Sequence, residues 1–223
     1  MLVTVYRTPP ERCSGGVAVV IDVLRWSSAV VAALAAGAAG VEAFASADAA
    51  RVRASEIGAL LAGEREAHRI AGFDLGNSPL EFTRERVAGR VICATTTNGT
   101  RALLAARDAS AVFVAGFVNL AVTAEAVREL LVCERDLRHV HIICAGSEGQ
   151  PSAEDSLCAD WLAAAIRGHS LPETAAALVA LGTSAPHANT LRAAGYAEDV
   201  AFALRLDVLP IVAALRDGRI VAA

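Results

Sequence analysis

Short apolar runs alternate with segments of helical periodicity along most of this chain. A run that is apolar at successive positions predicts a strand covered on both faces. The segments between the runs begin or end near Ser, Asn or Gly, which are favoured at helix ends. Strands are predicted at 17–23, 41–44, 60–64, 90–94, 111–115 and 139–144, and helices at 27–36, 47–57, 100–107, 121–134 and 154–167. This alternation predicts an α/β fold, a sheet with helices on both faces.

The two ends of the chain and one internal segment depart from this alternation. Strands at 2–6 and near the C-terminus, where Asp217-Gly218 forms a turn, are expected to make the sheet mixed, and further helices are predicted at 173–181 and 189–194. Residues 65–89 are rich in turn signals and show no period, and a loop of that length in a compact domain is usually functional. We predict a single domain over 1–223 with a hinge or lid at 65–89; two lobes hinged there are the alternative.

Composition excludes several classes of protein. Of the 223 residues, 55% are hydrophobic and the mean hydropathy is +0.46, but no apolar run approaches the ~18 residues of a membrane span. The N-terminus lacks the features of a signal peptide, so a soluble, cytoplasmic protein without a membrane partner is expected. A net charge of −4 and an aromatic content of 4% disfavour nucleic-acid binding. A homo-oligomer is compatible with all of this.

The usage of lysine and cysteine narrows the chemistry. All 20 basic residues are arginine, which excludes a Walker-type lysine and a lysine Schiff base and leaves arginine to bind anions. The five cysteines form no CxxC pair, which is typical of reduced, mostly buried thiols rather than a zinc site.

The segment 91–101 carries the strongest local signal. An apolar strand ends in Thr95-Thr96-Thr97-Asn98-Gly99-Thr100-Arg101 and leads into a helix. Backbone N–H groups, hydroxyls and a guanidinium at the amino end of a helix favour a phosphate or another oxyanion. An ordinary N-capped helix is the alternative.

Two further strands end in polar loops. Asp22 and Arg25 follow the apolar run at 17–21, and Glu148 lies in a glycine-bracketed loop after the strand at 139–144, shortly before Glu154 and Asp155. Ligands of open α/β sheets bind outside the carboxyl ends of the strands, so the loops are expected to converge in one crevice.

Each of these residues also has a structural interpretation. Asp22 could bind Mg²⁺ or attack phosphorus and Arg25 could hold phosphoryl oxygens, or the two could form an ion pair that closes the strand–helix corner. Cys158, four residues after Glu154, is more typical of a packing thiol than of a nucleophile. His187 could be a general acid, but a lone histidine is more often structural.

Five segments together resemble the 2-phosphosulfolactate phosphatase family. They are VVIDVLRWSS (19–28), AGERE (62–66), GFDLGNSPLEF (72–82), ATTTNGTRAL (94–103) and CAGSEGQPSAEDSLCA (144–159). The resemblance spans nearly the whole chain. It implies a three-layer α/β/α fold with a mixed, largely parallel sheet, and a Mg²⁺-dependent phosphatase of coenzyme M biosynthesis that converts 2-phosphosulfolactate, a small anionic phosphorylated substrate, to 3-sulfolactate and phosphate.

The resemblance also assigns roles to individual positions. It implies catalytic roles for Asp22, Arg25, Glu148 and Cys158, substrate or phosphate binding by Asn77, Ser78, Thr95, Thr96, Thr97, Asn98, Gly99, Thr100 and Arg101, and Mg²⁺ binding by Asp22, Glu64, Glu154 and Asp155. Trp26 and Asp160 depart from the family pattern, and Trp26 is expected to narrow the site. Another small anionic phosphoester is the alternative substrate, and a non-catalytic anion-binding or sensor protein and a thiol-dependent hydrolase are the alternative functions.

Overall fold

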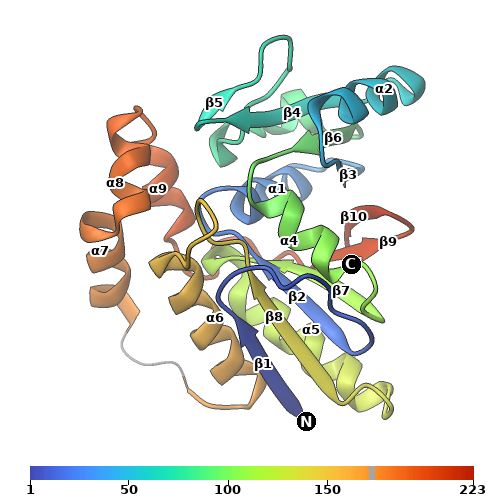
Figure 1. Cartoon of the computed structure of the whole chain (residues 1–223), viewed down its shortest axis with the longest axis vertical. Coiled ribbons are helices and arrows are strands. Elements are labelled where there is room, and N and C mark those ends of the chain that lie inside the picture. The colour runs from blue at the N-terminus through green and yellow to red at the C-terminus, as the bar shows by residue number, and fades with distance from the viewer. Residues whose placement is uncertain (171–173) are drawn as a thin grey trace.

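The computed structural model describes residues 1–170 and 174–223 (Figure 1). The strands are β1 (Leu2–Tyr6), β2 (Val17–Ile21), β3 (Gly40–Ala43), β4 (Leu60–Arg65), β5 (His68–Arg69), β6 (Val91–Thr95), β7 (Ala111–Ala115), β8 (His139–Cys144), β9 (Ala213–Arg216) and β10 (Arg219–Ala222). The helices are α1 (Trp26–Ala35), α2 (Ala47–Ile57), α3 (Arg84–Val87), α4 (Gly99–Ala106), α5 (Leu120–Cys133), α6 (Ala153–Ile166), α7 (Thr174–Ser184), α8 (Pro186–Ala193) and α9 (Ala197–Ala203), with 3₁₀ turns η1 (Pro79–Glu81) and η2 (Phe117–Asn119).

The strands form one ten-stranded sheet in the order β1-β8-β2-β7-β9-β10-β3-β6-β4-β5. Strands β1, β8, β2 and β7 are mutually parallel, as are β3, β6 and β4. The hairpin β9–β10 joins these two groups by antiparallel pairing, and β5 pairs antiparallel with β4. The prediction of a mixed, largely parallel sheet is therefore confirmed, but β1 contributes nothing to its mixed character, because an apolar strand pattern does not encode the direction of pairing.

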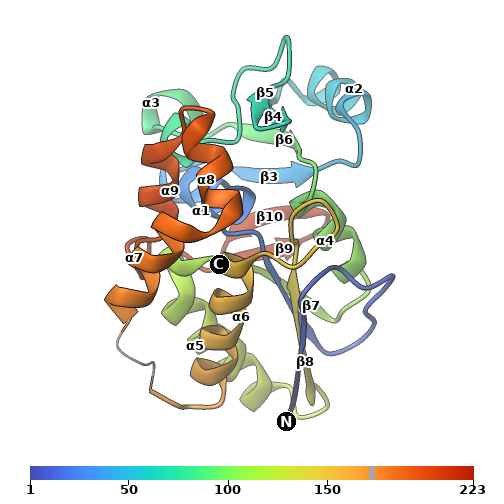
Figure 2. The ribbon, with the colours of Figure 1, turned by 60° about the vertical axis from the view of Figure 1, so that its left-hand side comes forward.

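Both faces of the sheet are covered, as the apolar runs predict. In β2, Val17, Val19 and Ile21 belong to a core cluster that includes residues of α5 and α6, whereas Ala18 and Val20 belong to a second cluster with residues of α1 and α4. Figure 2 shows α5 and α6 on one side of β7 and β8 and α4 on the other. Successive side chains of a strand point to opposite faces, so this division confirms a three-layer α/β/α arrangement.

Several local elements differ from the sequence prediction. Helix α1 begins at Trp26, and Ser27 does not cap it, since its hydroxyl accepts a hydrogen bond from the Asp22 backbone N–H (2.9 Å). Helix α8 begins at Pro186 instead of residue 189, and α9 was not predicted. The predicted start of a helix at residue 173 lies outside the described residues, and the helix continues to Ser184.

The segment 65–89 is more ordered than its sequence suggests, because it contains β5, η1 and α3. These elements are only two to four residues long, too short for a recognisable hydrophobic period. Among the helices of the described residues, none is both long and apolar enough to cross a membrane.

Candidate active site

The predicted convergence of the polar loops is confirmed. Loops after β2, β4, β6 and β8 line one cleft of about 1000 Å³, and α8 forms a further wall. Of the residues nominated from the sequence, the cleft is lined by Asp22, Arg25, Glu64, Asn77, Thr96, Thr97, Asn98, Glu148 and Glu154. The cleft thus lies at the carboxyl ends of parallel strands, where α/β folds bind ligands.

Asp22 lies in close contact with the start of α4. A Cβ atom at Gly99 would stand 2.7 Å from Asp22 Oδ2 and 2.7 Å from Trp26 Cδ2, so only glycine permits this approach. The other oxygen, Asp22 Oδ1, accepts a hydrogen bond from the Trp26 backbone N–H (3.2 Å). Burial raises the pKa of Asp22 to about 6, and the charges of Glu64 and Glu154 add to this effect. A nearly buried carboxylate with a raised pKa beside other carboxylates is a common feature of functional sites.

Arg25 does not pair with Asp22. Its Nη1 donates to Asp199 Oδ2 of α9 (2.7 Å), and its Nη2 donates to the carbonyl oxygen of Ala67 in the β4–β5 turn (2.8 Å). The guanidinium carbon lies 3.9 Å from the centroid of the Tyr196 ring, and Ser78 Oγ donates to Asp199 Oδ1 (2.6 Å). The corner ion pair considered from the sequence is therefore wrong in its partner: Arg25 joins the loop after β2 to two other walls of the cleft.

The donors of the Thr-rich loop are largely engaged within the protein. Glu64 Oε1 accepts hydrogen bonds from Thr97 N (3.0 Å) and Thr97 Oγ1 (3.1 Å), and Glu64 Oε2 accepts from Ala67 N (3.0 Å). Thr96 N donates to Thr100 Oγ1 (3.2 Å), and Thr100 N donates to Thr96 Oγ1 (3.4 Å). The Glu64 carboxylate thus accepts both donors of Thr97, which the sequence assigned to a substrate anion. Asn98, which makes no side-chain capping bond, still faces the cleft.

Two acidic residues of α6 have different surroundings. Asp155 accepts hydrogen bonds from Val23 N (2.8 Å) and Gly146 N (3.0 Å), which ties the loops after β2 and β8 together. It does not line the cleft, and burial, with the charges of Asp22 and Glu154, raises its pKa to about 8. Its place favours a structural role over the metal role that the resemblance implies.

Glu154 does line the cleft. Its Oε1 lies 2.7 Å from His187 Nδ1, while its buried Oε2 has no hydrogen-bond partner among the described residues. Burial opposes protonation of His187, but the hydrogen bond and charge of Glu154 raise its pKa overall. Glu154 is therefore a buried carboxylate with one oxygen that has no hydrogen-bond partner among the described residues.

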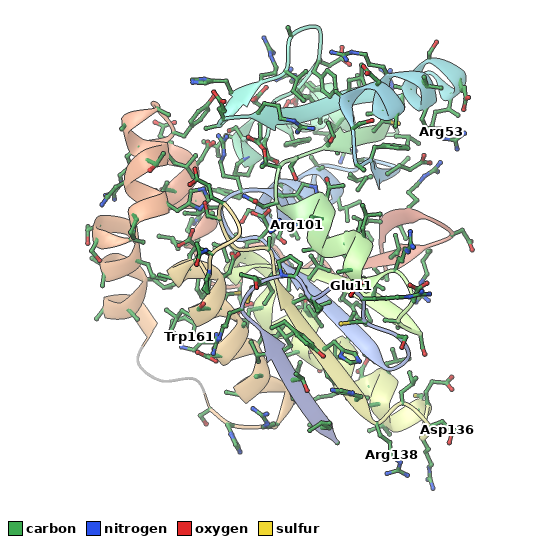
Figure 3. The ribbon with its side chains drawn as sticks, viewed as in Figure 1. Glu11, Arg53, Arg101, Asp136, Arg138 and Trp161 are labelled. Carbon is green, nitrogen blue, oxygen red and sulfur yellow. The ribbon has the colours of Figure 1, made fainter. Side chains whose placement is uncertain are left out.

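The remaining nominated residues lie at the rim of the cleft or outside it. Glu148 is exposed on the rim with a left-handed backbone (φ 52°). Arg101 is exposed at the start of α4 (Figure 3) and does not line the cleft. Four buried residues do not line it either: Ser78, Thr95, Gly99 and Thr100.

Cys158 also lies away from the cleft. Its side chain, on α6, is fully buried in the core cluster between that helix and the sheet, and burial raises the pKa of its thiol well above the usual range. This placement supports the packing interpretation of the residue and not the catalytic role implied by the resemblance.

The two departures from the family pattern lie outside the cleft as well. Trp26 is 1% exposed and packs in the core with residues of β2 and α4, so the expectation that it narrows the site is wrong. Asp160 forms a surface ion pair with Arg7 (2.6 Å). Neither side chain lines the cleft, although the Trp26 backbone N–H donates to Asp22 Oδ1.

Sequence reasoning missed several residues of the site. Arg65, at the end of β4, lines the cleft, as do Pro186, Thr190 and Leu191 of α8; His187 of the same helix, considered from the sequence as a general acid, lines it too. Asp199 and Tyr196 hold Arg25. Arg65 lies within a quoted motif, AGERE; Asp199 of α9 and Tyr196, just before that helix, carry no local signal, since they meet Arg25 only after folding.

Mg²⁺ can be weighed against the side chains present. Among the described residues, no group of three or more His, Cys, Asp or Glu side chains is arranged to hold a metal ion. Asp22 and Glu154 nevertheless offer oxygen atoms of the kind that Mg²⁺ prefers, and Glu154 Oε2 is unpartnered among those residues. Mg²⁺ is commonly held by one or two carboxylates together with water and phosphate oxygens, so this pair fits such a site.

Comparisons with known proteins agree with the resemblance. The 2-phosphosulpholactate phosphatase family matches residues 2–218. A protein of Thermotoga petrophila named probable 2-phosphosulfolactate phosphatase is 35% identical over 97% of this chain and 96% of its own length. A protein of the same name from Symbiobacterium thermophilum is 38% identical over 96% of this chain and 97% of its own length. The chain therefore belongs to the 2-phosphosulfolactate phosphatase family.

Proposed function

We propose that this protein is a Mg²⁺-dependent phosphatase that hydrolyses 2-phosphosulfolactate to 3-sulfolactate and phosphate. The observation that carries the proposal is the cleft in which Asp22, Glu154 and the loop 96–98 meet. The family and the names of its relatives support the substrate. In the family's context, the reaction serves coenzyme M biosynthesis.

The charge of the cleft supports the need for a divalent cation. Among the described residues, its lining includes five carboxylates, those of Asp22, Glu64, Glu66, Glu148 and Glu154, against two arginines, Arg25 and Arg65. A phosphoester with further acidic groups would be repelled by this surface. Mg²⁺ held by Asp22 and Glu154 would neutralise phosphoryl charge when bound.

The protein's own residues supply positioning and charge stabilisation. Asn98, at the start of α4, can donate its side-chain amide to a phosphoryl oxygen in the cleft. The hydrogen bonds of Glu64 to Thr97 hold this loop in place. In the overall reaction the bond between phosphorus and the substrate's ester oxygen breaks, water supplies the new oxygen on phosphorus, and the released alcohol takes a proton.

A metal-dependence assay tests the proposal. Phosphate release from 2-phosphosulfolactate and from a panel of other small phosphoesters would be measured with Mg²⁺, with EDTA, and with Mg²⁺ restored after EDTA. We expect turnover of 2-phosphosulfolactate to fall at least about 100-fold in EDTA, which corresponds to roughly 2.7 kcal/mol of barrier, and to return with Mg²⁺. Equal rates in EDTA and Mg²⁺ would refute the metal dependence. Saturable binding of the substrate without phosphate release would instead support an anion-binding protein.

A further inference from the structure

The two arginines of the cleft differ in whether an acidic side chain forms an ion pair with them. Arg25 is buried, and its guanidinium forms an ion pair with Asp199 in which the two side chains are 2% and 5% exposed. Its second terminal nitrogen donates to Ala67 O. Asp199 therefore already balances the charge of Arg25.

Arg65 is held only by neutral groups. Its Nη1 donates to the carbonyl oxygen of Glu64 (2.7 Å), and its Nη2 donates to Thr95 Oγ1 (3.2 Å). No carboxylate among the described residues lies within ion-pair distance of it, although Glu64 and Glu66 are its neighbours in the chain. A guanidinium has five N–H donors, so about three stay available.

The position of Arg65 places this unmatched charge at the cleft. The residue ends β4, whose neighbour β6 leads into the loop 96–98, and both Arg65 and that loop line the cleft. Its two hydrogen bonds to the ends of β4 and β6 fix the guanidinium while leaving its charge for a ligand. A planar guanidinium suits a carboxylate or sulfonate, which it can bind through two parallel hydrogen bonds.

We propose that Arg65 binds one of the two acidic groups of the substrate that are not transferred, the carboxylate or the sulfonate, and so determines the preference for phosphoesters that carry such a group. This inference rests on the proposed function, because it assigns the binding of one part of that substrate. The phosphoryl group then lies near Asp22, Glu154 and Asn98, and Arg65 binds the opposite end of the substrate.

A substrate series tests this assignment. Arg65→Met and Arg65→Lys would be compared with the wild type on 2-phosphosulfolactate, on 2-phospholactate, which lacks the sulfonate, and on isopropyl phosphate, which lacks both additional acids. Arg138→Met is a matched control, because Arg138 is an exposed arginine near the opposite end of the sheet (Figure 3).

We expect Arg65→Met to raise the KM for 2-phosphosulfolactate about 10- to 100-fold, as for a lost hydrogen bond to a charged group. The KM for isopropyl phosphate should change less than about twofold, Arg65→Lys should be intermediate, and Arg138→Met should match the wild type. An equal loss on all substrates, or no loss on any, would overturn the proposal. Melting temperatures would show that each variant is folded.

A binding measurement separates this proposal from the proposed function. If the wild type hydrolyses none of the three phosphoesters, the proposed function fails, and titration calorimetry with 3-sulfolactate still tests Arg65. Weaker binding of 3-sulfolactate by Arg65→Met than by Arg138→Met would support the role of Arg65 in holding the acid. Equal affinities would overturn it.

Discussion

Removal of Asp199 is expected to destabilise the protein strongly, because it leaves a buried arginine without its counter-ion. Arg25 and Asp199 form a 2.7 Å ion pair with side chains 2% and 5% exposed. Breaking a buried pair by deleting one partner typically costs about 3–5 kcal/mol. Asp199→Ala also removes the acceptor of the Ser78 hydroxyl (2.6 Å), whereas the bond from Arg25 to Ala67 O can remain.

We therefore predict a loss of about 4 kcal/mol in the free energy of unfolding for Asp199→Ala, or roughly 8–16 °C in Tm for a chain of this size. The control is Asp160→Ala, since Arg7 and Asp160 form a 2.6 Å ion pair with side chains 39% and 55% exposed, respectively. An exposed pair of that kind contributes about 0–1 kcal/mol. The two ion pairs thus have nearly the same N–O distance and differ in the burial of their side chains.

Urea unfolding followed by circular dichroism measures both free energies, and equal m-values would show that the same transition is compared. The double variant Arg25→Met/Asp199→Leu should recover part of the loss, because it removes the unpaired charge as well. If Asp199→Ala loses no more stability than Asp160→Ala, the interpretation of Arg25 as a buried link between the cleft walls is wrong.

Three further predictions concern the carboxylates, the thiol and the Thr-rich loop. Asp22 has a pKa of about 6 in the folded protein against 3.8 ordinarily. Its ionisation therefore destabilises the folded state increasingly as pH rises from about 4 to 6. In EDTA at pH 7, the free energy of unfolding of Asp22→Asn should exceed that of the wild type by up to about 3 kcal/mol, and this difference should vanish near pH 4. An unchanged or lower stability at pH 7 in urea titrations would contradict this. Cys158→Ser should keep turnover within about tenfold, because the thiol lies in the core; a loss beyond roughly a thousandfold with an intact fold would make the thiol a nucleophile. Thr97→Val deletes the hydroxyl bonded to Glu64 (3.1 Å) and should cost about 0.5–1.5 kcal/mol of unfolding free energy; no measurable change would show that this contact does not hold the loop.

Hydrophobic periodicity predicted much of the fold because each central strand is a continuous apolar run that can be recognised from its own residues. Strand β2 is buried along its length, and its odd and even residues pack in different core clusters. The direction of β1 and the existence of α9 could not be predicted in the same way. The pairing of β1 with β8 joins residues more than 130 positions apart, and α9 has only seven residues.

The sequence predicted the location of the candidate site better than the contacts between its side chains. The ends of β2, β6 and β8 meet because parallel strands share one carboxyl edge, and this rule needs only the sequence. The partners of individual side chains depend on tertiary contacts. Arg25 meets Asp199 across 174 positions, and Thr97 meets Glu64 across 33. For that reason the sequence predicts an anion site with all its donors available, although the donors of Thr97 already bond to the Glu64 carboxylate.

The turnover number of Asp22→Asn with 2-phosphosulfolactate and Mg²⁺ tests the central claim most directly. Asp22 is nearly buried in the cleft against Gly99, and asparagine preserves its shape while removing its charge. If the cleft hydrolyses phosphoesters through this carboxylate, kcat should fall at least about a thousandfold, roughly 4 kcal/mol of barrier, while Asp160→Asn retains wild-type turnover. A kcat for Asp22→Asn close to that of the wild type, in a protein that folds normally, would contradict the account.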